Sequence, residues 1–139
     1  MTRGLLFGLV VLVIAACDKG SDKPGAGGGP AVVAGAARND VVAAWTQAGL
    51  TVSAMTADKS GAVGTDCVTG TVSGVDVVVC TFPTPDDAKA AEAKGLTWVG
   101  DTTGTSLARG ALLVAVADRR KADPSGRTIN TIATTFRGK

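Results

Sequence analysis

The chain has 139 residues, of which 45% are hydrophobic, 19% charged and only 4% aromatic, and its formal net charge is +2 with no histidine. This near balance of charge excludes the strongly basic composition typical of nucleic-acid-binding domains, so no nucleic acid is expected as a partner. The absence of histidine removes the commonest general base and the commonest metal ligand.

The N-terminal segment has the pattern of a secretion signal. Arg3 precedes an apolar run over residues 5–14, which is too short to span a bilayer, since a transmembrane helix needs about 20 apolar residues. The run has the length of a signal-peptide core and is followed by small residues. The four residues at its end, Ile14-Ala15-Ala16-Cys17, resemble the lipobox of bacterial lipoprotein precursors.

This resemblance implies that cleavage follows Ala16 and that a diacylglyceryl group is attached to the sulfur of Cys17. Residues 1–16 are then a signal peptide, and the mature protein is held by lipid on a membrane of the bacterial cell envelope, on the periplasmic side or at the cell surface. Two alternatives remain: Cys17 can be incidental to an ordinary cleavage site, or the segment can be an uncleaved anchor. Asp18 resembles an inner-membrane retention signal of some lineages, which leaves the choice of membrane open.

Residues 17–37 are predicted to form a lipidated tether. Gly, Ala and Pro dominate this stretch, and such a composition is typical of flexible linkers. The glycine-rich run within it lacks the Lys-Ser/Thr pair of a phosphate-binding loop. Residues 38–139 are then long enough for one small domain.

The first half of this domain begins with a helix, predicted from a cap at Asn39 to about Ala48. A short extended stretch follows at residues 50–55. Two strands rich in Val and Thr are then predicted at residues 65–72 and 75–82.

In the second half, Thr84 is predicted to cap a helix that ends at Gly95, with Pro85 in its first turn. Strands follow at residues 103–109 and 111–118, and Asp123-Pro124 is expected to start a last helix. Four apolar residues share one face of that helix at helical spacing: Ile129, Ile132, Ala133 and Phe136.

The order α-β-β-α-β-β-α predicts an α+β fold. We expect a small two-layer domain, in which helices pack on an antiparallel sheet of two hairpins.

Cys67 and Cys80 flank a predicted hairpin whose turn is Ser73-Gly74. Counting outward from this turn places the two cysteines opposite each other in a non-hydrogen-bonded pair, with Cα atoms about 4.5 Å apart, which a disulfide can span. Export from the cytoplasm would preserve such a bond. A free or regulatory thiol pair and a metal site are the alternatives. The bridge is expected on the sheet face away from the main core, toward solvent.

The sequence predicts no catalytic residues, no cofactor and no metal site. It lacks the G-x-S-x-G motif. Asp86 and Asp87 belong to the first turn of a helix, where carboxylates interact with the helix dipole. Glu92 is expected on a solvated helix face, and Trp98 in the core, with exposure in a contact surface as its alternative.

Arg119, Arg120 and Lys121 form a possible basic contact patch, within a C-terminal third that has seven basic and two acidic residues from Arg109 onward. The sequence thus predicts a non-enzymatic, lipid-anchored domain that binds an envelope protein or a ligand. The alternative is an accessory lipoprotein that contacts anionic membrane through these basic residues. A solvated loop is the simplest interpretation of the patch.

Overall fold

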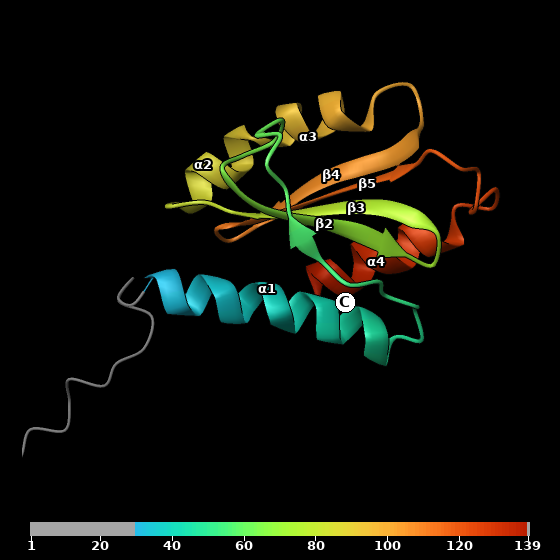
Figure 1. The fold of residues 1–139 in the computed structure, drawn as a ribbon, viewed down its shortest axis with the longest axis horizontal. Helices are drawn as coiled ribbons and strands as arrows, with labels where there is room; N and C mark the ends of the chain where they lie inside the picture. The colour runs from blue at the N-terminus through green and yellow to red at the C-terminus, as the bar shows by residue number, and fades with distance from the viewer. Residues whose placement is uncertain (1–29, 139) are drawn as a thin grey trace, which may run out of the picture.

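The computed structural model describes residues 30–138 (Figure 1). The predicted signal peptide, Cys17 and the tether up to residue 29 lie outside the described residues. The elements are α1 (Pro30–Gln47), β1 (Thr56–Ala57), β2 (Asp66–Val72), β3 (Val75–Thr81), α2 (Pro85–Ala90), α3 (Glu92–Val99), β4 (Thr103–Arg109), β5 (Leu112–Asp118) and α4 (Arg127–Arg137). The α+β class and both hairpins are confirmed. The predicted order is incomplete, because it lacks β1 and treats α2 and α3 as one helix.

The strands form one antiparallel five-stranded sheet in the order β1-β2-β3-β5-β4. The two hairpins, β2–β3 and β4–β5, meet along β3 and β5. The short strand β1 lies on one edge, and β4 lies on the other. Of the predicted extended stretch before β1, Val52 forms an isolated bridge to Val72.

Helices cover both faces of the sheet, so the predicted two-layer arrangement is wrong. Figure 1 shows α1 and α4 on one side of the sheet and α2 and α3 on the other. The reason lies in the central strands, since all residues of β5 and nearly all of β3 are buried. Strands that are apolar on both faces need cover on both faces.

The larger core lies between the sheet and the α1–α4 layer. Trp45 of α1 is fully buried there, and its Nε1 donates to the carbonyl oxygen of Ile132 at 3.2 Å. The apolar stripe predicted for the last helix is confirmed, because all four of its residues are buried. The hydrogen bond from Trp45 to Ile132 satisfies the indole N–H, which would otherwise lose its water partner on burial.

Helix α1 begins nine residues earlier than predicted, at Pro30 instead of Asn39. Asn39 is therefore inside the helix and exposed, and it is not a cap. Residues 30–37 of the predicted tether are helical. Arg38 fastens this part of α1 to the sheet, because its Nη1 lies 2.7 Å from Oδ1 of Asp66 in β2. A hydrogen bond from Thr81, followed by that from Arg38, holds the pKa of the Asp66 carboxyl below 3.8.

The predicted cap of α2 is confirmed. Thr84 Oγ1 accepts a hydrogen bond from the Asp87 N–H at 3.1 Å, and Pro85 occupies the first turn. The predicted end at Gly95 is wrong. The helical path is interrupted at Ala91, and Gly95 is a buried residue in the middle of α3. A glycine is needed there because α3 lies so close to β4 that a Cβ on Gly95 would collide with Ser106.

Helix α4 starts at Arg127, after the cap residue Gly126, and not at Asp123-Pro124 as predicted. Asp123 is nevertheless part of the helix start. Its side chain is buried, and Oδ2 accepts from the Ile129 N–H at 2.9 Å. Burial acts to raise the pKa of this carboxyl, but hydrogen bonds from Ile129, Thr128 and Ser125 together outweigh burial and hold the pKa below 3.8.

Asp123→Asn is expected to lower the free energy of unfolding by about 1 kcal/mol at neutral pH, because a neutral amide is a weaker acceptor for the N–H groups of α4. A lowered pKa in the folded state stabilises the fold above pH 3.8, and this contribution disappears as the pH falls through the lower value. Urea unfolding at a series of pH values should therefore show wild type and variant converging in acid. Asp40→Asn, at an exposed position, is the matched control. A difference that stayed constant in acid would contradict this role.

The β2–β3 hairpin has the predicted register throughout, from Val72↔Val75 to Cys67↔Cys80. Ser73 and Gly74 both have positive φ angles, 48° and 85°, as a tight two-residue hairpin turn requires. Cys67 and Cys80 form a disulfide with a Cα–Cα distance of 4.0 Å.

The disulfide lies on the predicted face of the sheet, opposite the larger core. Its predicted exposure to solvent is wrong, since Cys67 is 4% and Cys80 0% exposed. Both belong to a second buried cluster with Ala91 of the helical layer and Leu113 of β5. The bridge is therefore enclosed between the sheet and the α2–α3 layer.

Candidate functional site

The predicted contact residues Arg119, Arg120 and Lys121 follow directly after β5 and form one exposed segment, here called the basic turn. The basic turn lies at the opposite end of the sheet from the start of α1 (Figure 1). Arg109, at the other end of β5's hairpin, lies over the ring of Phe136, 5.4 Å from its centroid. The basic residues of the C-terminal third therefore do not form one continuous surface.

Arg119 is held by two groups from other elements. Its guanidinium lies over the ring of Trp98, 4.3 Å from the centroid, and its Nη2 donates to the Trp98 carbonyl. Its Nη1 lies 3.9 Å from Oδ2 of Asp76 in β3. Trp98 itself is half-buried and packs against the second cluster, so its core role is combined with a surface contact. Stacking of this kind fixes a guanidinium in a defined position.

Arg120 joins the basic turn to the β2–β3 hairpin. Its Nη1 lies 2.7 Å from Oδ1 of Asp76 and 3.3 Å from the Gly74 carbonyl oxygen. Asp76 thus faces two guanidinium groups with one negative charge. Lys121 is exposed, has a positive φ of 55°, and forms no ion pair with any residue in the described range. The three cations of the basic turn and Asp76 together therefore carry a net positive charge.

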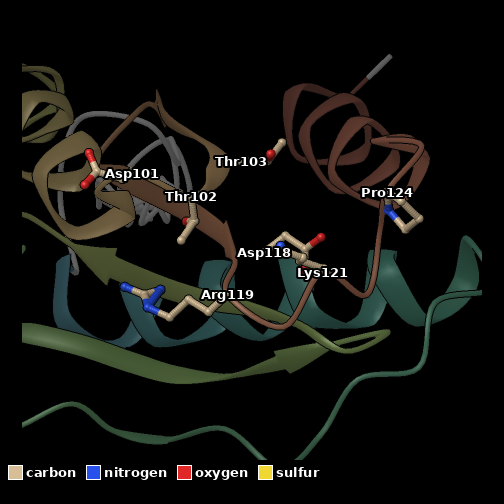
Figure 2. A pocket seen from close by; sticks show the side chains of 7 residues that line it. All are labelled: Asp101, Thr102, Thr103, Asp118, Arg119, Lys121 and Pro124. Atoms are coloured by element: carbon tan, nitrogen blue, oxygen red, sulfur yellow. The ribbon is translucent and has the colours of Figure 1, made fainter.

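A depression of about 340 Å³ opens beside the basic turn (Figure 2). Its lining consists of Asp101, Thr102, Thr103, Asp118, Arg119, Lys121 and Pro124. The carboxylate of Asp118 is buried and already accepts the N–H groups of Ala122 and Asp123, at 2.7 and 2.9 Å. Asp118 therefore serves the conformation of the turn, and Arg119 is held by Trp98 and Asp76. The other charged lining groups, Asp101 and Lys121, form no ion pair within residues 30–138.

The chemistry of this depression suits binding by ionic contacts and hydrogen bonds. Its lining contains hydroxyls, carboxylates and cations, without a thiol or an imidazole. Within residues 30–138, His, Cys, Asp and Glu side chains do not gather in groups of three that could hold a metal ion. The pair Asp86–Asp87 lies in the first turn of α2, as predicted, where Asp87 Oδ2 accepts from Thr84 Oγ1 at 2.8 Å.

Glu92 has a contact that sequence reasoning missed. Its side chain is not on a solvated face, because Oε1 accepts from the Ala108 N–H of β4 at 2.8 Å and Oε2 lies 2.8 Å from Lys89 Nζ. The hydrogen bond from Lys89, assisted by that from Ala108, outweighs burial and holds the pKa of Glu92 below 4.5. From the sequence alone, only the pairing of Lys89 with Glu92 could have been found, because the two residues are three apart on a helix. The contact of Glu92 with β4 depends on how α3 lies on the sheet.

Comparison of the chain with protein-family models, with curated proteins and with solved structures gave no match. None of the helices between Pro30 and Gly138 is both long enough and apolar enough to cross a bilayer.

Proposed function

We propose that this protein is a lipid-anchored lipoprotein of the bacterial cell envelope, whose domain binds another envelope protein or a ligand without catalysing a reaction. The observation that carries the proposal is the tetrad Ile14-Ala15-Ala16-Cys17 at the end of a short apolar run. A buried disulfide agrees with an oxidising compartment outside the cytoplasm.

The position of the basic turn supports a binding role away from the anchor. The chain enters the described domain at Pro30, and the basic turn lies at the far end of the sheet (Figure 1). The depression opens beside the basic turn (Figure 2). An exposed Lys121 beside two guanidinium groups favours an acidic partner, since opposite charge steers association. The anchor would then hold the domain, while the distal end carries the contact.

The test of anchoring is Cys17→Ser in the full chain, expressed in a bacterial host. The wild type is expected in the membrane fraction, with an intact mass that equals the chain from Cys17 onward plus acyl groups. The variant is expected to lack the acyl mass, because serine offers no thioether sulfur. Ser21→Ala is the control, since it alters the same segment and leaves the cysteine in place. Recovery of Cys17→Ser in membranes at the normal mature mass would refute the anchor.

A second candidate function is contact with the anionic membrane surface through the basic turn. The observation in its favour is the exposure of the basic turn, since each basic residue near such a surface adds about 1 kcal/mol of attraction. Lys121→Glu in the unlipidated chain from Asp18 onward is then expected to weaken binding to anionic vesicles by at least about fivefold. Lys59→Glu is the matched charge control. Equal binding of anionic and neutral vesicles at moderate salt would exclude this function.

A further inference from the structure

Lys121 has a backbone conformation that residues with a side chain disfavour. Its φ angle is 55°, in the left-handed region, where the Cβ of an L-residue lies too close to the following carbonyl oxygen. Within residues 30–138, seven glycines have positive φ angles, and the other residues that do are Ser73 and Lys121. Ser73 belongs to a two-residue hairpin turn, which requires this conformation. Lys121 lies on the connection between β5 and α4, where a glycine would fit without strain.

The residues on both sides of Lys121 hold it in this conformation. The buried Asp118 carboxylate accepts from the N–H groups of Ala122 and Asp123, at 2.7 and 2.9 Å. On the other side, the ion pair of Arg120 with β3, at 2.7 Å, ties the preceding residue to the sheet. Because both flanks are fixed, the backbone of Lys121 cannot relax.

The side chain of Lys121 gives the fold no ion pair that would offset this strain. It is exposed and unpaired within residues 30–138, whereas the two arginines that precede it are paired with Asp76. Lys121 also lines the depression. Strained residues cluster at binding and catalytic sites, so the conformation of Lys121 points to a contact outside the chain.

A second unpaired charge of opposite sign lines the same depression. Asp101, on the connection between α3 and β4, is exposed and forms no ion pair in the described part of the chain. Figure 2 shows Asp101 and Lys121 on separate loops of the depression. An anionic bilayer presents mainly one sign of charge, so its surface would repel Asp101. A protein surface can offer a carboxylate to one loop and a cation to the other.

We propose that Lys121 is the residue through which the domain binds its partner, and that the partner is an envelope protein with charges of both signs. A carboxylate of the partner pairs with the Lys121 ammonium, and a neighbouring cation faces Asp101. This inference rests on the binding function proposed above and names the chemistry of the contact.

Arg119 and Arg120 are positioning residues in this contact. Their guanidinium groups are engaged within the domain, by Trp98 and by Asp76. The basic turn therefore presents one free cation in a fixed place. A contact that is already ordered in the free protein loses less conformational freedom on binding.

The test is carbodiimide crosslinking of the full-length protein in membranes of the bacterium that makes it. The reagent activates a carboxylate, the Lys121 amine attacks the carboxyl carbon to form an amide, and the displaced oxygen leaves as part of a urea. Peptide mapping is expected to join Lys121 to an Asp or Glu of another protein. Lys121→Ala is expected to abolish this adduct. Lys59→Ala, at another exposed lysine, is the matched control and should keep it.

A second measurement tests the strain without a partner. In detergent solution Lys121→Gly is expected to melt about 3 °C above Lys121→Ala, because glycine adopts a positive φ freely and alanine does not. Wild type and Lys121→Ala should melt at the same temperature, since both keep a Cβ at this position. Equal melting temperatures of the glycine and alanine variants would remove the strain on which the proposal depends and would overturn it.

The crosslinking outcomes separate this proposal from the binding function itself. Adducts that persist in Lys121→Ala would overturn the choice of Lys121 and leave a binding domain. A wild type that forms no adduct with any protein would overturn both. If instead phosphatidylglycerol vesicles bound the wild type and Lys121→Ala weakened that binding, without a protein adduct, Lys121 would be assigned to the membrane and the proposal would fall.

Discussion

Replacing Cys67 and Cys80 together by alanine is expected to lower the free energy of unfolding by about 3 kcal/mol. The disulfide closes a loop with a sequence separation of 13, and its removal lets the unfolded chain sample many more conformations. Alanine is the suitable replacement because both positions are buried, and serine would bury a hydroxyl without a partner. Urea unfolding followed by the fluorescence of Trp45 and Trp98 measures the loss.

Reduction of the wild type provides the control for this experiment. Wild type with reductant should unfold at the urea concentration at which the double alanine variant unfolds, and reductant should leave the variant unchanged. The two cysteines would have no structural role if the variant were as stable as the oxidised wild type. A change in the slope of the unfolding transition would instead report a more expanded unfolded state.

Gly95→Ala is expected to destabilise the domain by about 2 kcal/mol or more. In an exposed helix this change stabilises by about 1 kcal/mol. At Gly95, however, the new Cβ would collide with Ser106 Oγ and would lie 2.8 Å from Ser106 Cβ and 3.4 Å from Ala115 Cβ. The helix α3 must then move away from β4, which opens the packing of the second buried cluster. Thermal or urea unfolding of the single variant measures the effect.

The double variant Gly95→Ala, Ser106→Gly is the decisive companion. Removing the Ser106 side chain eliminates both of the close contacts and leaves only an ordinary contact with Ala115. The buried Ser106 Oγ has no hydrogen-bond partner among the described residues, so its loss costs little. We expect most of the stability to return. If the double variant were as unstable as Gly95→Ala alone, the Ser106 side chain would not be the obstacle.

The β2–β3 hairpin could be predicted to the residue, because two independent signals coincide there. The dipeptide Ser73-Gly74 tolerates the positive φ angles of a tight turn, and the resulting register sets Cys67 opposite Cys80. The cap at Thr84 was equally local, since its hydrogen bond to Asp87 spans three residues. Such features depend on neighbouring residues alone.

The features that could not be predicted depend on how separate elements pack. The run ALLVAVA indicates burial on both sides, but it does not say that helices provide the cover on both faces. Glycine is typical of the residue that follows a helix, so the sequence places the end of the helix at Gly95. Only the closeness of Gly95 to Ser106 shows why a glycine lies inside α3. Helix α1 extends into a segment whose Gly and Ala content is typical of a linker, so its start at Pro30 was missed.

The candidate site was predicted in part. The run of Arg119, Arg120 and Lys121 is evident in the sequence, as is its place after a strand. The roles of Trp98 and Asp76 are not, because they lie 21 and 44 residues from the arginines that contact them. Nothing in the local pattern of either residue points to an arginine so far along the chain.

The attachment of α1 has a mechanical consequence. Any pull on the chain upstream of Pro30 enters the domain along this helix. The helix is joined to the rest by the Arg38–Asp66 ion pair at its middle and by the packing of Trp45 near its end. The ion pair is partly exposed and yields first, whereas the buried indole, bonded to α4, resists longest. Traction would therefore loosen the beginning of α1 while the sheet and the distal depression keep their shape.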